Sequence, residues 1–271
     1  DVEWIPDPKA GETLPEAAPA DGPGEDARAA CQTLWAAARE RAGSKDPDLQ
    51  PYLKTILCRI VSLAGVLRES PPGGEPTLKL VSLPVDCSDP SKVEEKSILI
   101  AFMKSVGRRK PQLVGYNSAQ ADVPIIVQRA IVNGFPKPWE GVDDFDARNS
   151  TYSVDLADSL GQYRDRPSLH QAATLSGIPG KIDVSGGSVA DMWLEGRLPE
   201  IVEYNEFDAF TTHLLWARGA HFSGLLPRDA YLREQNLVRE LLEEEIAGGK
   251  AHLERFVGDW DRLLAITGQS Y

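Results

Sequence analysis

The chain has 271 residues and a mass of 29.6 kDa, enough for one large domain or two small ones. Hydrophobic residues make up 42% of it and charged residues 26%, which excludes a largely disordered or collagen-like chain. Acidic residues outnumber basic ones by 41 to 29, giving a formal net charge of −12. We therefore do not expect the broadly basic surface by which many proteins bind nucleic acid.

The first fifth of the chain combines high acidity with a proline-rich segment. Residues 1–50 carry a net charge of −6, which is half of the total. Five prolines between residues 6 and 25 predict a loop or a partly ordered insertion. Apolar residues then recur at helical spacing from Ala27 to Ala38, and Gly43 follows them. This pattern predicts an amphipathic helix that ends near Gly43.

The middle of the chain predicts a hairpin followed by alternating helices and strands. The hairpin turn is expected at the Pro-Pro-Gly-Gly segment 71–74, and Asp122 is expected to cap the last helix of this part. The predicted elements are a strand at 56–67, a strand at 77–83, a helix at 94–106, a strand at 112–116 and a helix at 123–132.

The remainder of the chain predicts one more strand and then only helices. The strand is expected at 152–156, and the helices at 168–175, 189–194, 198–219, 228–247 and 251–266. Because strands first pair as a hairpin and then alternate with helices, we predict an α/β fold. It would have a mixed sheet, helices on the faces of that sheet and a helical C-terminal part.

Cysteines, histidines and long apolar runs give no sign of secretion or of a membrane anchor. The three cysteines and four histidines are scattered, without the spacing of a thiolate metal site or a disulfide framework. No run of 18 apolar residues and no signal peptide occurs in residues 1–271, although the sequence begins with Asp1 rather than Met. We expect a protein of a reducing compartment, with a cytoplasmic location and no membrane partner.

Asp1 and Glu3 form the first of three acidic groups that could carry chemistry. In a strand, residues two apart face the same side, so both carboxylates would project together. Two carboxylates on one buried face repel each other unless a cation neutralises them, which favours a site for a hard metal ion. The alternative is an acidic terminus without a ligand.

The second and third groups lie at the start of one helix and inside another. Asn117 and Asp122 follow a buried strand, where α/β sheets place ligand groups, although Asp122 could simply cap its helix. Tyr204 and Asp208 are four residues apart and share a helix face that points toward the core. A buried Asp needs a partner, either a metal ion or the Tyr204 hydroxyl.

In combination, these segments resemble the DEDD (DnaQ-like) 3′–5′ exonuclease superfamily. Within it, the chain is similar to predicted exonucleases related to the proofreading domain of family B DNA polymerases. The DxE start matches Asp1 and Glu3, the segment LVGYNSAQAD matches the second motif, and the YxxxD element places the chain in the tyrosine-bearing DEDDy branch. Further family-like segments follow in the same order, including SVDLADSL, LSGIPGK and SVADMWLEGRL.

The resemblance implies a fold and a domain division. It implies a ribonuclease H-like exonuclease domain over residues 1–224, with the Pro/Ala-rich insertion at about 8–50, and residues 225–271 as a helical extension of the same domain. The insertion and the C-terminal helices have no counterpart that we can assign. One departure is Ala121, which stands where an aromatic residue commonly precedes the acid of the second motif.

The resemblance also implies a two-metal-ion mechanism. Asp1, Glu3, Asp122 and Asp208 would hold two Mg²⁺ or Mn²⁺ ions, and Tyr204 would orient the attacking water. By analogy, Asp1 would bridge both ions, Glu3 and Asp208 would complete one site, and Asp122 would support the other. Asn117 would contact substrate or shape its loop. Asp155 lies at a strand position and could support a metal ligand from outside the site, although we favour a structural role.

The implied substrate is the 3′ end of a single-stranded nucleic acid, DNA rather than RNA. Such an end can be bound by base stacking and a few phosphate contacts, which is compatible with an acidic protein. The candidates for phosphate contacts are Arg108, Arg109, Lys110, Arg129, Arg164 and Lys181. Two alternatives remain: a catalytically silent ribonuclease H-like scaffold that binds proteins, and a soluble α/β domain whose acidic pairs are helix caps and surface groups.

Overall fold

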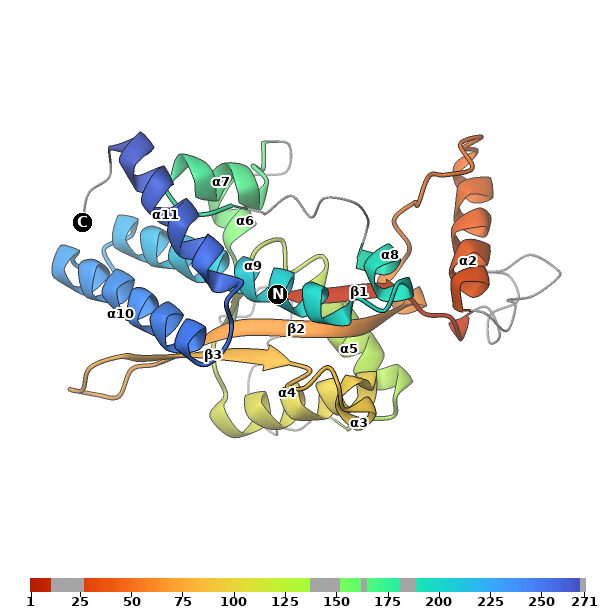
Figure 1. Ribbon diagram of the computed structural model, residues 1–271, viewed down its shortest axis with the longest axis horizontal. Coiled ribbons are helices and arrows are strands. Elements are labelled where there is room, and N and C mark those ends of the chain that lie inside the picture. The colour runs from red at the N-terminus through yellow and green to blue at the C-terminus, as the bar shows by residue number, and fades with distance from the viewer. Residues whose placement is uncertain (11–26, 137–151, 162–164, 181–188, 269–271) are drawn as a thin grey trace.

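A computed structural model describes residues 1–10, 27–136, 152–161, 165–180 and 189–268 as a mixed α/β protein (Figure 1). One sheet is antiparallel, in the order β1-β2-β3, and consists of β1 (Val2–Pro6), β2 (Cys58–Glu69) and β3 (Thr77–Leu83). A second sheet has two parallel strands, β4 (Leu113–Gly115) and β5 (Ser153–Asp155).

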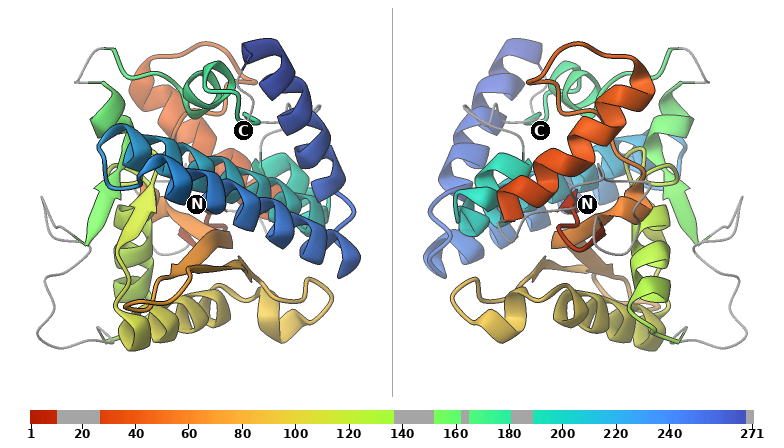
Figure 2. Two further views of the ribbon diagram at one scale, coloured as in Figure 1. Left: turned by 90° about the vertical axis from the view of Figure 1, so that its left-hand side faces the viewer. Right: turned by 90° about the vertical axis from the view of Figure 1, so that its right-hand side faces the viewer.

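Helices cover both faces of the antiparallel sheet. Helices α9 and α10 lie over one face and α4 lies across the other, as two perpendicular views show (Figures 1 and 2). The described helices are α2 (Ala27–Ala42), α3 (Pro90–Val93), α4 (Glu95–Arg109), α5 (Asp122–Val132), α6 (Leu156–Leu160), α7 (Leu169–Leu175), α8 (Val189–Leu194), α9 (Leu198–Phe222), α10 (Arg228–Ala247) and α11 (Leu253–Thr267), with a 3-10 turn η2 (Thr55–Leu57) before β2.

Strand β2 is the centre of the fold because it pairs on both edges. It pairs with β1 from Val2 opposite Leu63 to Pro6 opposite Cys58, with a register irregularity between Glu3 and Trp4. Its second half pairs with β3 as the predicted hairpin. The first half of β2 is buried except at Arg59, which explains why its sequence is mostly apolar instead of alternating.

The predicted elements lie within a few residues of the described ones, and local signals set several helix ends. Gly43 adopts a left-handed conformation directly after α2, as its position in the sequence suggests. Lys110 takes the same conformation at the end of α4. Ser168 caps α7 in a reciprocal capping box with Gln171. The Pro/Ala-rich segment lies largely outside the described residues, which omit 11–26.

Two expectations about this architecture are wrong. The sequence predicts one mixed sheet, but the described strands form two sheets, and β1 and β4 do not pair. The reason is visible at Val2, whose backbone N–H at the outer edge of β1 donates to a carboxylate oxygen of Asp122 at 2.9 Å instead of to a strand. The second wrong expectation concerns Asp122, which is not the N-cap of α5: it is the first residue of that helix, and Ala121 precedes it at the cap position.

Buried ion pairs join the C-terminal helices to the sheet and to α9. Both carboxylate oxygens of Glu234 on α10 accept hydrogen bonds from Arg68 Nε on β2, at 3.0 and 2.9 Å. Glu206 on α9 accepts from Lys250 Nζ at 2.6 Å and lies 2.9 Å from His252 Nε2, so it holds the segment between α10 and α11. The C-terminal helices are therefore attached to the rest of the fold by polar contacts as well as by a shared core.

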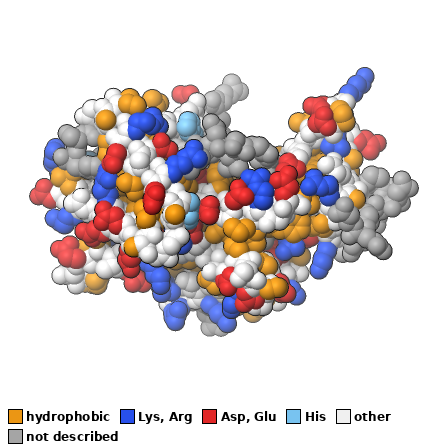
Figure 3. All heavy atoms as spheres, viewed as in Figure 1, with side chains coloured by type: hydrophobic (Ala, Val, Ile, Leu, Met, Phe, Trp, Pro, Cys, Tyr) orange, Lys and Arg blue, Asp and Glu red, His pale blue; other side chains and the backbone are white. Residues whose placement is uncertain are grey.

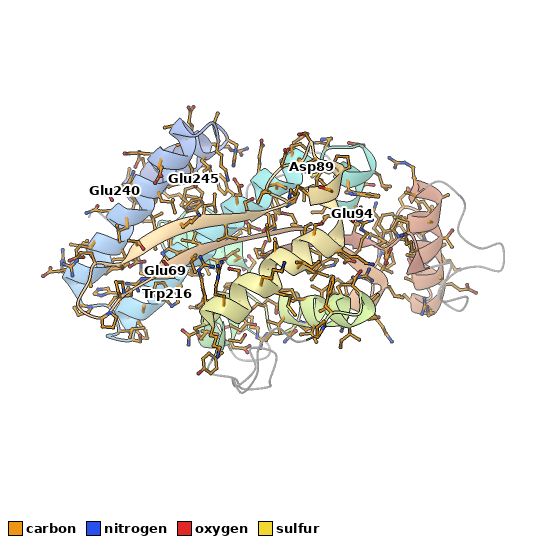
Figure 4. All side chains as sticks on the ribbon, turned by 90° about the horizontal axis from the view of Figure 1, so that it is seen from below. Glu69, Asp89, Glu94, Trp216, Glu240 and Glu245 are labelled. Atoms are coloured by element: carbon orange, nitrogen blue, oxygen red, sulfur yellow. The ribbon has the colours of Figure 1, made fainter. Side chains whose placement is uncertain are left out.

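The outer face of α4 and the far end of the hairpin carry charged side chains. Figure 4 shows α4 running from the region of Asp89 and Glu94 toward the end of β2, where Glu69 lies. There Arg109 Nε donates to Glu69 Oε1 at 3.2 Å. Acidic and basic side chains are interspersed over the face seen in Figure 3, without one dominant basic field on that face. In the described part of the chain, no helix is long and apolar enough to cross a membrane.

Candidate functional site

Three of the predicted carboxylates come together where the start of β1 meets α9. Asp1, Glu3 and Asp208 each offer one carboxylate oxygen, and these three oxygens lie within 4.8 Å of one another. Asp1 and Glu3 lie at the beginning of the chain, where β1 starts. Asp208 lies on α9, 205 residues after Glu3, and is 5% exposed. Three like charges at this separation repel one another unless cations or protons compensate them.

The pairing of β1 with β2 fixes the direction of the first two carboxylates. The backbone N–H of Ala64 donates to the carbonyl oxygen of Asp1 at 3.0 Å, so the ladder extends to the first residue. Glu3 lies opposite Ser62. Because side chains alternate along a strand, Asp1 and Glu3 share one face of the sheet, and Val2 points to the other.

Helix α9 carries Asp208, and a contact of Asn205, one turn earlier, fixes how this helix lies against the sheet. Nδ2 of Asn205 donates to Oγ of Ser62 at 2.9 Å, and both side chains are buried. Ser62 is the cross-strand partner of Glu3. The residue next on that face of α9, Asp208, therefore lies beside Glu3. Tyr204, 7% exposed, is on the same face four residues before Asp208, as its spacing predicts.

Asp122 lies next to the cluster but is not one of the three clustered carboxylates. Its Oδ1 accepts the hydrogen bond from the backbone N–H of Val2, the residue between Asp1 and Glu3. The residue is 9% exposed, and burial raises the pKa of the Asp122 carboxyl, an effect that the N-terminal ammonium and, to a smaller extent, the hydrogen bond from Val2 partly offset. Asp122 thus approaches β1 at its edge, whereas Asp208 approaches it over a face.

Asn117 shapes the loop that leads to Asp122. It is an exposed residue with a φ of 57°, a left-handed conformation that Asn tolerates better than most residues. Its backbone N–H donates to Oδ1 of Asp155 at 2.7 Å, and the N–H of Ala119 donates to Oδ2 of the same residue at 3.1 Å. Asp155, for which the sequence favours a structural role, therefore holds this loop in place through two backbone amides.

The basic residues predicted to contact substrate divide into three groups. Arg129 is wrong as a candidate: it is buried and donates to Glu95 at 2.7 and 2.8 Å and to Asp7 at 2.8 Å, because α5 packs inward at that position. Arg108, Arg109 and Lys110 are exposed at the end of α4. Arg164 and Lys181 lie outside the described residues.

Most of the chain matches one known protein family. Residues 50–260 match the family described as predicted 3′–5′ exonucleases related to the exonuclease domain of PolB. The chain belongs to this family. The matched range contains Asp122, Tyr204 and Asp208 and extends through α10 into α11, so the C-terminal helices lie within the family match. No curated protein matches the chain.

The family match does not include Asp1 and Glu3, because it begins at residue 50. Two of the three clustered carboxylates therefore lie outside the matched range, and the folded structure places them beside Asp208, which lies inside it. The hydrogen bonds from β1 to β2 and to Asp122 bring residues 1–3 against the matched part of the chain. Sequence spacing alone could suggest Asp1 and Glu3 as a pair, but not their distance from Asp208.

Proposed function

We propose that the protein is a metal-dependent 3′–5′ exonuclease that removes nucleotides from the 3′ end of single-stranded nucleic acid, with DNA as its preferred substrate. The observation that carries this proposal is the cluster of Asp1, Glu3 and Asp208 oxygens within 4.8 Å. Membership of the predicted exonuclease family supports the reaction class.

The donor set fits a hard divalent cation. All three clustered groups are carboxylates, whose oxygens are the ligands that Mg²⁺ and Mn²⁺ prefer, and neither a Cys nor a His belongs to the cluster. Asp1, Glu3 and Asp208 would hold one ion, and Asp122, at the edge of β1, would support a second. The repulsion among the clustered carboxylates is a reason for such a site to bind cations.

The proposed roles follow from how each side chain is held. Two bound cations would lower the pKa of a bound water and stabilise charge on the attacking and leaving oxygens of a phosphodiester. Tyr204 comes from the same helix face as Asp208, and in this proposal its hydroxyl orients the attacking water. Asn117 would contact the substrate or act through its loop. The hydrogen bond from Val2 N–H to Asp122 Oδ1 holds the Asp122 side chain at the edge of β1, next to the residues that carry two of the clustered carboxylates.

The same proposal concerns the fold and the domain. We infer that the hairpin, the β4–β5 pair and the helices on both faces correspond to a ribonuclease H-like exonuclease domain over residues 1–224, with residues 225–271 as its extension. Support for the extension comes from the family match, which reaches residue 260, and from the buried Glu206 and Glu234 contacts.

Substrate binding is expected to be weak and sensitive to salt. The net charge of −12 opposes nonspecific binding of a polyanion, and the exposed cations at the end of α4 are few. A short 3′ end held near a metal site by stacking would suit this surface better than a duplex. High-affinity, salt-insensitive duplex binding would contradict this part of the proposal.

The decisive experiment incubates the protein with single-stranded DNA, RNA and mismatched duplex, each labelled at the 5′ end, in Mg²⁺, Mn²⁺ or chelator. A 3′–5′ exonuclease produces a ladder that shortens from the 3′ end, and a 3′-blocked DNA resists. The variants Asp208→Ala and Asp122→Ala should lose the activity. Glu243→Gln, an exposed residue of α10, is the control and should retain it.

Each possible result separates the proposal from its alternatives. Retention of activity in both Asp208→Ala and Asp122→Ala would refute the site assignment. Absence of any Mn²⁺-dependent degradation by the wild-type protein, with no Mn²⁺-induced rise in melting temperature, would instead favour a catalytically silent scaffold. Internal cleavage of the 3′-blocked DNA would show an endonuclease and contradict the exonuclease assignment.

A further inference from the structure

The Asp155 carboxylate holds the loop between β4 and α5 through several backbone amides. Oδ1 accepts hydrogen bonds from the N–H groups of Asn117, at 2.7 Å, and Ala157, at 3.0 Å. Oδ2 accepts from the N–H of Ala119 at 3.1 Å. Asp155 is buried at the end of β5, opposite Gly115 of β4. One side chain thus caps α6 and also binds a loop from 36 to 38 residues earlier in the chain.

The loop that Asp155 binds is tightly folded. A Cβ added at Gly115 would lie 2.5 Å from Cβ of Ser118, so Ser118 occupies the space in which any larger residue would place its side chain. Asn117 between them has a left-handed conformation, which costs free energy in a residue other than glycine. Other contacts must stabilise a backbone in this conformation. The Asp155 carboxylate makes two such contacts, with the N–H groups of Asn117 and Ala119.

The loop is hydrogen-bonded to the first turn of α5, which carries Asp122. The carbonyl oxygen of Ser118 accepts from the N–H of Val123 at 2.9 Å, so the first turn of α5 is bonded to the loop. Asp122 then reaches the N–H of Val2 at 2.9 Å. Hydrogen bonds joined by short stretches of backbone therefore connect Asp155, through the loop and the first turn of α5, to the edge of β1 at Val2, between Asp1 and Glu3.

We propose that Asp155 is a positioning residue for the carboxylate site: it fixes the β4–α5 loop so that Asp122 is held against β1. This inference rests on the proposed exonuclease function. Asp155 itself does not touch the three clustered carboxylates, and its effect passes through the loop. A residue needed only for folding would change stability, whereas a positioning residue changes metal affinity and turnover in protein that remains folded.

The test replaces Asp155 by Asn, which has nearly the same size but presents an NH₂ group to backbone N–H donors. Apparent affinity for Mn²⁺ should fall about tenfold, as is common when a residue that orients a ligand is changed. It is measured both from half-maximal activation of 5′-labelled DNA degradation and from the Mn²⁺ dependence of the melting temperature. The kcat should fall, and the KM for DNA should stay within about twofold of the wild-type value.

Two further variants keep the result interpretable. Asp155→Ser retains a hydroxyl that can cap α6 but cannot span both loop amides, and it should show the same loss of Mn²⁺ affinity if Asp155→Asn does not fold. Asp89→Asn makes the same substitution at the N-cap of α3, away from the loop, and should leave the Mn²⁺ curves unchanged. All measurements are made well below the melting temperature of each variant.

The outcomes distinguish failure of this inference from failure of the proposed function. If the wild-type protein is inactive and Mn²⁺ does not alter its melting temperature, the exonuclease proposal fails, and the inference fails with it. If the wild-type protein is active but folded Asp155 variants have wild-type Mn²⁺ curves and kcat, the positioning role alone is refuted. Reduced stability with unchanged Mn²⁺ affinity identifies Asp155 as structural only, which also refutes the inference.

Discussion

Nδ2 of Asn205 donates a hydrogen bond to Oγ of Ser62 at 2.9 Å, with both residues 0% exposed. This bond joins the middle of α9 to the central strand at the position that pairs with Glu3. Tyr204 and Asp208 lie on either side of Asn205 along the helix. A polar pair inside an apolar interface allows fewer alternative alignments than apolar packing does, so it specifies where Asp208 lies relative to Glu3.

Replacing Ser62 with Ala should destabilise the protein and disturb the carboxylate cluster. The change removes the acceptor of the Asn205 amide and leaves a buried N–H group without it, which typically costs about 1–3 kcal/mol of unfolding free energy. Urea denaturation measures this loss. The exposed residue Ser91 of α3 provides the control, and Ser91→Ala should be nearly neutral. Equal stability of Ser62→Ala and the wild-type protein would contradict a specifying role for this bond.

Asp208→Asn should have opposite effects on the melting temperature of the metal-free protein and on the stabilisation by Mn²⁺. Removing one of three mutually repelling charges should raise the melting temperature of the metal-free protein by about 2–4 °C per kcal/mol of relieved repulsion. The same change should abolish the further rise that Mn²⁺ causes in the wild-type protein. Differential scanning fluorimetry with and without Mn²⁺ measures both effects.

Glu243→Gln is the matched control, since it removes one negative charge from an exposed position of α10. It should leave the Mn²⁺-induced shift intact. A persistent Mn²⁺-induced rise in the Asp208→Asn variant would show that Asp208 does not bind the ion, even if its own substitution stabilised the metal-free protein.

Local sequence patterns predict most of the elements, because they depend on near neighbours. The capping box at Ser168 and the apolar run in β2 each determine structure within a few residues. The Tyr204–Asp208 spacing likewise predicts a shared helix face, which the structure confirms. The prediction of a single mixed sheet is wrong. Such a sheet requires β4 to pair with the outer edge of β1, but at Val2 the backbone N–H on that edge donates to the Asp122 side chain.

Long-range partners explain the remaining differences between the sequence-based expectations and the structure. Arg129 resembles a surface cation in sequence, but its partners Glu95 and Asp7 are 34 and 122 residues away. Asp155 makes one local contact, as the N-cap that accepts from the backbone N–H of Ala157 two residues later. Its bonds to Asn117 and Ala119 have no local signature. The three-carboxylate cluster is also long-range, so only folding brings Asp208 to Asp1 and Glu3.

Gly115→Ala should distort the loop that ends at Asp122. The added Cβ would lie 2.5 Å from Cβ and 2.6 Å from Oγ of Ser118. Overpacking of this kind typically costs about 1–3 kcal/mol of unfolding free energy. We also expect weaker Mn²⁺ activation, because the loop positions Asp122. Urea denaturation and Mn²⁺ titration of the nuclease activity measure the two effects.

A second substitution tests the cause of this loss. Ser118→Gly combined with Gly115→Ala removes the atoms that clash and should recover part of the stability. Gly65→Ala in β2 is the control, because its added Cβ would meet nothing within 4 Å and its φ is ordinary. If Gly65→Ala were as harmful as Gly115→Ala, the effect would reflect any added methyl group in a strand and not the contact with Ser118.

Glu206→Gln should weaken the attachment of the C-terminal helices in a manner that depends on pH. Burial opposes the charged form of Glu206, but its contacts with His252 Nε2 and Lys250 Nζ outweigh that effect and lower the pKa of its carboxyl. Since its pKa in the folded protein lies below that of the unfolded chain, the unfolded chain binds the proton first as the pH falls. The stabilisation is therefore complete above the unfolded pKa, about 4.3, and is lost as the pH falls through the folded value.

At pH 7 the wild-type protein should consequently exceed Glu206→Gln in unfolding free energy by about 1.5–3 kcal/mol, the typical contribution of hydrogen bonds to a charged group. The difference should shrink toward zero as the pH falls from about 5 to 3. Urea denaturation across this range measures it. Glu200→Gln, which removes an exposed partner of Arg197 on the same helix, should change stability far less. A Glu206→Gln deficit that stays constant down to pH 3 would mean that the lost contact is not the charged one, because a neutral hydrogen bond or packing defect would not titrate with the carboxyl group.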